Sequence, residues 1–201
     1  MRNKVFIIAL ALLVSCFALV HISSSQKKPP PKQNRIIKHQ AAREDPIKVV
    51  KVQSKSGLIN IGGNTFADDD WLRGLTVTVK NTSGKSIAFV ELELHFNGPE
   101  KSVGEVISGY PVMYGKVPPP GSASFEDGVI IPPNETVDVV LADDEYRRLR
   151  TFLNQTNYPE SIKDVELIIH QVIFKDNTKW MAGSLFRRDQ SDPDEWHLMF
   201  P

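Results

Sequence analysis

The sequence predicts an all-β domain with one helical insert, preceded by an N-terminal hydrophobic segment. Several stretches alternate apolar and polar residues with a period of two, as half-buried strands do. Short runs rich in Gly, Pro and Asn separate these stretches and predict turns. One stretch, residues 143–153, has the apolar spacing of an amphipathic helix. About seven short strands in this order are typical of a β-sandwich of the immunoglobulin-like type.

The composition fits one globular domain. The chain has 201 residues, of which 41% are hydrophobic and 24% are charged, and this balance is that of a folded protein rather than a disordered one. Its single cysteine, Cys16, leaves no partner for a disulfide within the chain and excludes a cysteine-rich zinc site.

Charge is unevenly distributed along the chain. Lys and Arg together number 24, as do Asp and Glu, but residues 26–55 carry nine basic and two acidic groups. Residues 56–201 then carry 13 basic and 22 acidic groups, a formal charge of −9. Because phosphate backbones repel a domain of this charge, we expect no nucleic acid among its partners.

The N-terminus has the three parts of a secretory signal. Two basic residues precede an apolar run over residues 5–20, and the small residues Ser23 and Ser25 follow it. This order predicts cleavage before Gln26, so that residues 1–25 are a signal peptide. We therefore expect an exported protein that is periplasmic, secreted or membrane-anchored, facing outside the cytoplasm.

Residues 1–25 also allow a membrane anchor. If they are not cleaved, the apolar run over residues 5–22 reaches the lower limit of a bilayer-spanning helix. Leu13-Val14-Ser15-Cys16 resembles a lipobox, which makes lipidation of Cys16 a second alternative. More Lys and Arg follow the segment than precede it, and for a retained helix the positive-inside rule puts the next domain in the cytoplasm. These alternatives stay open.

Residues 26–45 are predicted to be a flexible, basic, proline-rich linker. They contain three consecutive prolines, which favour an extended polyproline II conformation. The stretch offers too little apolar surface to offset the entropy cost of ordering it. The folded domain is therefore expected over residues 46–201.

The first half of that domain contains the clearest strand patterns. Residues 47–61 predict one or two strands. Residues 75–80 and 90–96 alternate apolar and polar side chains on either side of a short loop, and they predict an antiparallel pair. Residues 106–116 form a weaker strand, because Pro111 interrupts them.

The second half places the helix between strands. Residues 137–141 alternate again. Residues 143–153 predict the helix, with Asp143 as its N-cap. Residues 165–174 are apolar on both faces, which indicates a central strand, and a hairpin turn at 176–178 follows it.

Two stretches resemble a known family. LTVTVKNTSGKSIAFVELELHF, followed later by IPPNETVDVVL, is similar to the FxLYD-type domains of uncharacterised bacterial secreted or envelope proteins and to their immunoglobulin-like relatives. In those domains a strand ends in an Asn-x-Ser turn and a second strand follows. The resemblance covers residues 71–188, with Glu93-Leu94-His95-Phe96 in place of the aromatic-x-Leu-Tyr-Asp signature. It implies an envelope location and brings no catalytic residues.

Asp68, Asp69 and Asp70 are the candidate metal ligands. Consecutive carboxylates in a loop offer the hard oxygen atoms that Ca²⁺ prefers, and a solvated acidic loop is the competing interpretation. His95 and His170 lie in predicted strands and could meet across a sheet, but they do not form a metal-binding spacing motif. We expect no cofactor, with Ca²⁺ bound by these three aspartates as the alternative.

The sequence favours a non-enzymatic function. It contains no nucleophile elbow and no complete phosphate-binding loop. We expect an exported or membrane-tethered module for binding, adhesion or envelope structure, whose partner is a protein or a cell-envelope component. The alternatives are a hydrolase with an unrecognised site in the sandwich loops and a Ca²⁺-dependent binding module.

Overall fold

The computed structural model describes residues 31–42, 44–97, 106–117 and 129–199. Residues 32–201 belong to one compact unit. The predicted signal peptide or anchor, residues 1–25, lies outside the described residues. Within the described ranges, no helix is long and apolar enough to cross a membrane.

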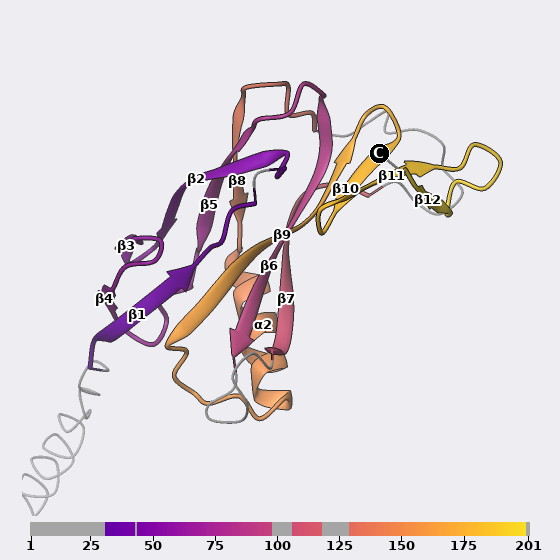
Figure 1. Ribbon diagram of the computed structural model, residues 1–201. Coiled ribbons are helices and arrows are strands. Elements are labelled where there is room, and N and C mark those ends of the chain that lie inside the picture. The colour runs from indigo at the N-terminus through magenta and orange to yellow at the C-terminus, as the bar shows by residue number, and fades with distance from the viewer. Residues whose placement is uncertain (1–30, 43, 98–105, 118–128, 200–201) are drawn as a thin grey trace, which may run out of the picture. The chain divides into compact units, whose positions relative to one another are not determined.

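The described residues form two β-sheets and one α-helix in a sandwich-like arrangement (Figure 1). The larger sheet contains β1 (Gln33–Lys38), β4 (Thr65–Ala67), β6 (Ile87–Asn97), β7 (Val106–Gly115), β9 (Asp164–Phe174), β10 (Thr178–Met181), β11 (Ser184–Arg188) and β12 (Trp196–Leu198). The smaller sheet contains β2 (Ile47–Ser54), β3 (Gly57–Leu58), β5 (Thr76–Asn81) and β8 (Thr136–Val140). The helix is α2 (Asp143–Gln155).

Strand β9 is the centre of the larger sheet. Along one edge it pairs with β6 over nearly its whole length, in antiparallel orientation. Its other edge is shared, because β1 pairs in parallel with residues 164–166 and β10 pairs antiparallel with residues 171–173. Between these two pairings, Nδ1 of His39 donates a hydrogen bond to the carbonyl oxygen of Leu167 over 2.8 Å. The prediction of a central strand over 165–174 is therefore confirmed.

One hydrophobic core joins the two sheets and the helix. The inward side chains of β6, such as Leu92 and Leu94, have no exposed surface. Trp71 is equally buried, and its indole Nε1 donates to the carbonyl oxygen of Ile162 over 2.9 Å. A fully buried indole with a hydrogen-bond partner stabilises the core without leaving a polar group unpaired.

The predicted pairing of residues 75–80 with residues 90–96 is wrong. These stretches form β5 and β6, but β5 pairs with β2 and β8 in the smaller sheet, whereas β6 lies in the larger one. The short loop between them carries the chain from one sheet to the other. Alternation predicted the strands correctly, yet it does not specify which partner each strand takes.

The side chain of Asn81 stabilises the loop that crosses from β5 to β6. It is fully buried, and its Nδ2 donates to the carbonyl oxygens of Lys85 and Ile131, each over 2.9 Å. Its Oδ1 accepts hydrogen bonds from the backbone N–H and the hydroxyl of Ser83, at 3.0 and 2.7 Å. One amide thereby satisfies backbone groups of the connecting loop and of Ile131, which forms a bridge with Ile87 of β6.

Part of the predicted flexible linker is a strand. Residues 33–38, within the range 26–45, form β1, in which Ile37 and Arg35 are fully buried. The prediction placed Arg35 in a flexible linker. Its burial depends on Asp69 and Ser161, which are distant in the sequence and so could not be read from the local pattern.

The helix is confirmed, but its predicted N-cap is wrong. The cap residue is Ala142, whose backbone N–H donates to the Glu145 carboxylate over 3.2 Å. Asp143 is the first helical residue, and its carboxylate binds Lys55 Nζ at 2.6 Å and Arg73 Nε at 3.1 Å. These hydrogen bonds from Arg73 and Lys55 lower the pKa of Asp143 to about 2.

The remaining strand predictions agree with the structure. The stretch 47–61 divides into β2 and β3, and 137–141 contains most of β8. β7 tolerates Pro111 because, within the described residues, this strand pairs with β6 alone. The turn at 176–178 connects β9 to β10, with Asn177 at φ 60°.

Replacing Asn81 by Ala is expected to destabilise the protein by about 2–4 kcal/mol, because it removes four hydrogen bonds of a fully buried amide. Asn154→Ala is the matched control, since this exposed asparagine has no side-chain hydrogen bond among the described residues. Urea unfolding of both variants measures the difference. Equal stabilities would contradict the role given to Asn81.

Candidate functional site

The side chains of Glu91, Glu93 and His95 project from the outer face of β6. They alternate with Leu92 and Leu94, which have no exposed surface and point into the core. Residues two apart in a strand share a face. The i, i+2, i+4 spacing therefore places two carboxylates and an imidazole in a row on the solvent side of the larger sheet.

A β-bulge in β9 adds His170 and Gln171 to this face. The register shifts next to Glu91, which pairs with Gln171, and His170 is left without a partner in the ladder. Both residues are half-buried, whereas the flanking Ile169 and Val172 are buried. A bulge has this effect because its extra residue reverses the alternation of side chains.

Glu93 is the centre of the resulting cluster. Its Oε2 atom lies 2.6 Å from Nε2 of His95 and 3.6 Å from Nδ1 of His170. Beside it, Nε2 of Gln171 donates to Oε2 of Glu91 over 2.5 Å. The side chains of His95, Glu93 and His170 are 19%, 23% and 37% exposed, so solvent reaches all three. We call these five residues, Glu91, Glu93, His95, His170 and Gln171, the Glu/His cluster.

The neighbouring strand β7 places no charged side chain directly opposite the Glu/His cluster. Gly109 lies opposite His95, Pro111 opposite Glu93 and Met113 opposite Glu91. A Cβ atom on Gly109 would lie 3.4 Å from the carboxylate of Glu93, so a side chain there would begin to cover it. Met113 is 50% exposed and adds an apolar border to the charged cluster.

The Glu/His cluster is suited to binding a cation. One ligand atom each from Glu91, Glu93 and His170 lie within 4.8 Å of one another. Within the described ranges, this is the one group of three or more His, Cys, Asp or Glu side chains with that geometry. No described Lys or Arg forms an ion pair with either carboxylate, whereas both histidines lie next to Glu93.

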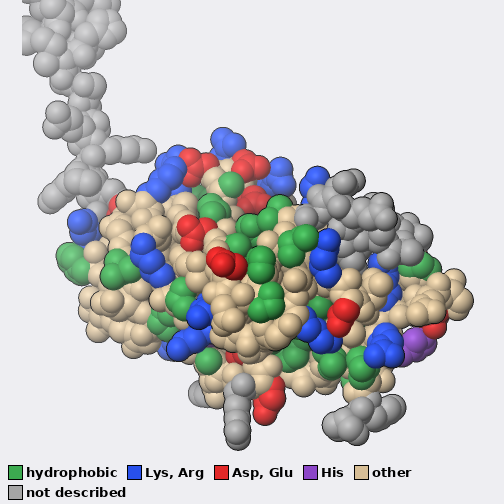
Figure 2. Space-filling model, turned by 90° about the horizontal axis from the view of Figure 1, so that it is seen from above, with side chains coloured by type: hydrophobic (Ala, Val, Ile, Leu, Met, Phe, Trp, Pro, Cys, Tyr) green, Lys and Arg blue, Asp and Glu red, His purple; other side chains and the backbone are tan. Residues whose placement is uncertain are grey.

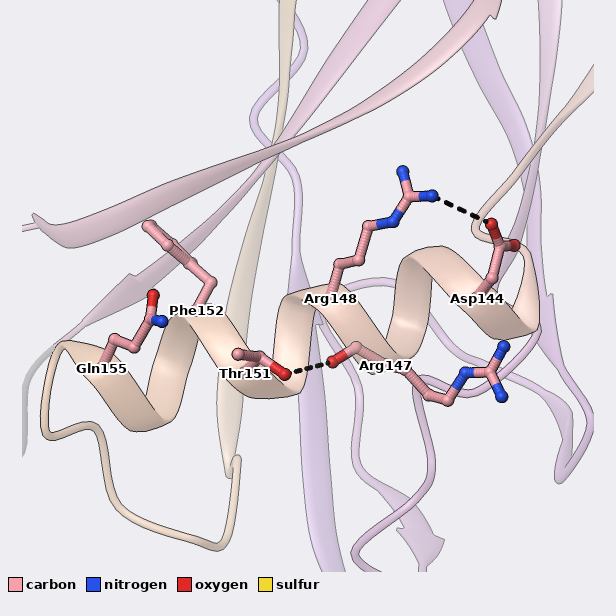
Figure 3. A pocket seen from close by; sticks show the side chains of 6 residues that line it. All are labelled: Asp144, Arg147, Arg148, Thr151, Phe152 and Gln155. Carbon is pink, nitrogen blue, oxygen red and sulfur yellow. Dashed lines mark hydrogen bonds and ion pairs between the residues drawn. The ribbon is translucent and has the colours of Figure 1, made fainter.

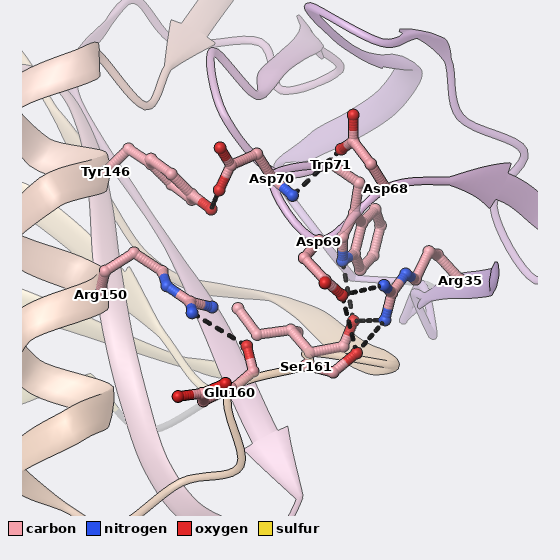
Figure 4. A network of polar contacts seen from close by, with 10 residues as sticks. Arg35, Asp68, Asp69, Asp70, Trp71, Tyr146, Arg150, Glu160 and Ser161 are labelled. Atoms are coloured by element: carbon pink, nitrogen blue, oxygen red, sulfur yellow. Dashed lines mark hydrogen bonds and ion pairs between the residues drawn. The ribbon is translucent and has the colours of Figure 1, made fainter. Parts of the chain in front are cut away.

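The predicted ligands Asp68, Asp69 and Asp70 are directed at different partners (Figure 4). Oδ1 of Asp68 accepts a hydrogen bond from the backbone N–H of Asp70 at 3.0 Å. Oδ1 of Asp70 accepts one from the Tyr146 hydroxyl, also at 3.0 Å. Burial and this bond to Asp70 raise the pKa of Tyr146, which keeps the phenol protonated as a donor. Calcium binding by the three residues stays a prediction.

Asp69 instead pairs with the buried Arg35. Nη2 of Arg35 lies 2.5 Å from Oδ1 of Asp69, and Nη1 donates to Ser161 Oγ at 2.8 Å and to the Ile162 carbonyl at 2.7 Å. The Ser161 hydroxyl also donates to Asp69, at 2.9 Å. Burial opposes ionisation of Asp69, but the hydrogen bonds from Ser161 and Arg35 outweigh it and lower its pKa. This network fixes β1 against the Asp68–Asp70 loop (Figure 4).

Two cavities lie away from the Glu/His cluster. One, of about 400 Å³, is lined by α2 alone, through Asp144, Arg147, Arg148, Thr151, Phe152 and Gln155 (Figure 3). Because a single helix face lines it, it cannot enclose a ligand. The other, of about 490 Å³, lies beside the β9–β10 turn, where Lys85 Nζ pairs with Asp176 at 2.7 Å. Lys85 belongs to the stretch Ser83-Gly84-Lys85-Ser86, so the lysine of this stretch is paired with a carboxylate.

Charges of both signs mix on the surface. Figure 2 shows Lys and Arg side chains interspersed with Asp and Glu on the face that it displays, with hydrophobic side chains among them. Interspersed charges keep a surface soluble without creating a large field of one sign.

The chain matches no protein-family model, no curated protein and no solved structure. The candidate site therefore depends on the geometry of the chain alone.

Alternation in the sequence already indicated that Glu91, Glu93 and His95 share one face, and it left open whether His95 and His170 meet. The structure shows that both histidines meet at Glu93. The missing information was the bulge, since unbroken alternation over residues 165–174 does not place His170 and Gln171 together on the outer face.

Replacing Asp69 by Ala is expected to cost about 3–5 kcal/mol, because the buried Arg35 guanidinium loses its countercharge. Asp68→Ala, in the same loop, removes only a local hydrogen bond and is expected to cost about 1 kcal/mol or less. Urea unfolding compares the two. Since the folded pKa of Asp69 lies below its ordinary value of 3.8, its contribution is complete above that pH and is lost on further acidification. Equal losses in both variants would contradict the ion-pair role.

Proposed function

We propose that this protein is a non-enzymatic, exported or membrane-tethered β-sandwich module of the immunoglobulin-like type, and that it binds a protein or another cell-envelope component. The observation that carries the proposal is the Glu/His cluster on the outer face of the larger sheet. Half-buried ionisable groups arranged around one carboxylate on a solvent-facing sheet contribute little to the core. They are the kind of preorganised polar group that binding surfaces use.

The surroundings of the cluster support binding rather than catalysis. Its side chains lie on an open strand face, and the exposed Met113 borders them. Apolar contacts beside a few fixed polar groups are typical of protein interfaces. A hydrolase would instead be expected to place such groups in a concave pocket that excludes water.

The export part of the proposal comes from residues 1–25. Their basic start, apolar run and small residues are those of a secretory signal, with a retained anchor or a lipidated Cys16 as alternatives. With a cleaved signal or a lipidated Cys16, the domain that begins at β1 would meet its partner outside the cytoplasm. For a retained helix this orientation goes against the positive-inside rule, so the protease test below decides it.

A photo-crosslinking residue at position 113 tests the binding face. The control is position 50 in β2 of the smaller sheet, because Val50 and Met113 are nearly equally exposed, at 47% and 50%. In the native host we expect a discrete covalent adduct from position 113 alone, and we expect Glu93→Gln to reduce it. No adduct from position 113, or adducts from position 50 alone, would refute the outer face of β6 and β9 as the binding surface, and equal adducts from both positions would show that the surface is not specific.

Cell fractionation with N-terminal sequencing tests export. We expect either a chain that begins at Gln26 in the exported soluble fraction, or a membrane-bound chain whose domain is cleaved by protease added outside the cell. A full-length chain in the soluble cytoplasm, or a membrane-bound chain protected from that protease, would refute export.

A further inference from the structure

We propose that Glu91, Glu93 and His170 bind a divalent transition-metal ion of the Zn²⁺ class, and that His95 orients the Glu93 carboxylate. The inference rests on the proposed function only in that both concern the same face of the larger sheet. Metal binding requires the chain alone, so it is measured without the partner.

The ligand set favours a transition metal over Ca²⁺. Carboxylate oxygen and imidazole nitrogen are both common Zn²⁺ ligands, whereas Ca²⁺ and Mg²⁺ take sets of oxygen atoms. Two carboxylates with one imidazole make up such a mixed set in the Glu/His cluster.

The distances are close to those of a metal site. Bonds of about 2.0–2.2 Å to oxygen and nitrogen place neighbouring ligands of a tetrahedral Zn²⁺ about 3.4 Å apart. Nδ1 of His170 and Oε2 of Glu93 are already 3.6 Å apart. The ligand atom of Glu91 lies within 4.8 Å of both, so a small rotation of its side chain completes the three ligands.

The charges of Glu91 and Glu93 also favour a bound cation. Glu91 and Glu93 lie on one strand face, and no described Lys or Arg pairs with them. Two carboxylates whose oxygen atoms lie within 4.8 Å repel each other, and a divalent cation between them replaces this repulsion by attraction. A divalent cation carries the charge that offsets these two carboxylates.

His95 has the position of a residue that supports a metal ligand. Its Nε2 lies 2.6 Å from Oε2 of Glu93, a hydrogen-bond distance that is too short for both atoms to be neighbouring ligands of one ion. Hydrogen bonds of this kind fix the orientation of a coordinating carboxylate. Three protein ligands on an exposed face also leave a fourth position for water or for a side chain of the partner.

The test is a calorimetric titration of the purified protein with ZnCl₂ at neutral pH, with CaCl₂ as the second titrant. We expect saturable binding of one Zn²⁺ per chain and no response to Ca²⁺. Glu93→Gln and His170→Ala should each weaken Zn²⁺ binding by about 100-fold or more, and His95→Gln by about tenfold. The Tm of each metal-free variant shows that it is folded, and if His170→Ala does not fold, Glu93→Gln decides the test.

His197→Gln is the matched control. Its side chain is 61% exposed, and it pairs with Asp189 at 2.9 Å, outside the Glu/His cluster. This variant should bind Zn²⁺ as the unchanged protein does. The proposal is overturned if the unchanged protein does not bind Zn²⁺, if the cluster variants bind equally well, or if only His197→Gln loses binding. Zn²⁺ binding without a position-113 adduct would refute the partner surface but support the metal site. A position-113 adduct without Zn²⁺ binding would support the partner surface but refute the metal site.

Discussion

The pairing of β9 along both of its edges is the constraint on which the larger sheet depends. β6 occupies one edge, while β1 and β10 share the other. The inward side chains of β9 belong to the core that joins the two sheets and the helix. The bulge at His170 lies opposite β6 and near the start of the β10 pairing. It lets β9 keep its inward residues on both sides of the irregularity while two consecutive side chains face outward.

The two networks of buried polar groups show why this arrangement needs more than hydrophobic burial. Arg35 attaches β1 to the Asp69 loop, and Asn81 attaches the β5–β6 crossing to Ile131, which forms a bridge with β6. In each network a polar side chain with no exposed surface has at least one hydrogen-bond partner that is distant in the sequence. Such contacts specify a unique arrangement of strands, because any other pairing leaves a buried polar group unsatisfied.

The local sequence pattern was sufficient to predict most strands and the helix, but it was not sufficient to predict which strands pair with one another. Period-two alternation located β5, β6 and β8, and helical spacing located α2, since these signals depend on neighbouring residues alone. The same signals assigned β5 and β6 to one hairpin and residues 33–38 to a linker, because sheet membership and the burial of Arg35 depend on distant residues. Part of the Glu/His cluster could be predicted, because alternation places Glu91, Glu93 and His95 on one face. The position of His170 could not be predicted, because it depends on the bulge in β9.

A crystal structure of the purified protein with Zn²⁺, with diffraction measured at the zinc absorption edge, tests the bulge and the cluster together. The expected result is one anomalous peak about 2.0–2.2 Å from carboxylate oxygens of Glu91 and Glu93 and from a ring nitrogen of His170. His170 and Gln171 should both lie on the outer face. A regular β9 ladder with His170 turned toward the core, or zinc bound only elsewhere, would contradict the site.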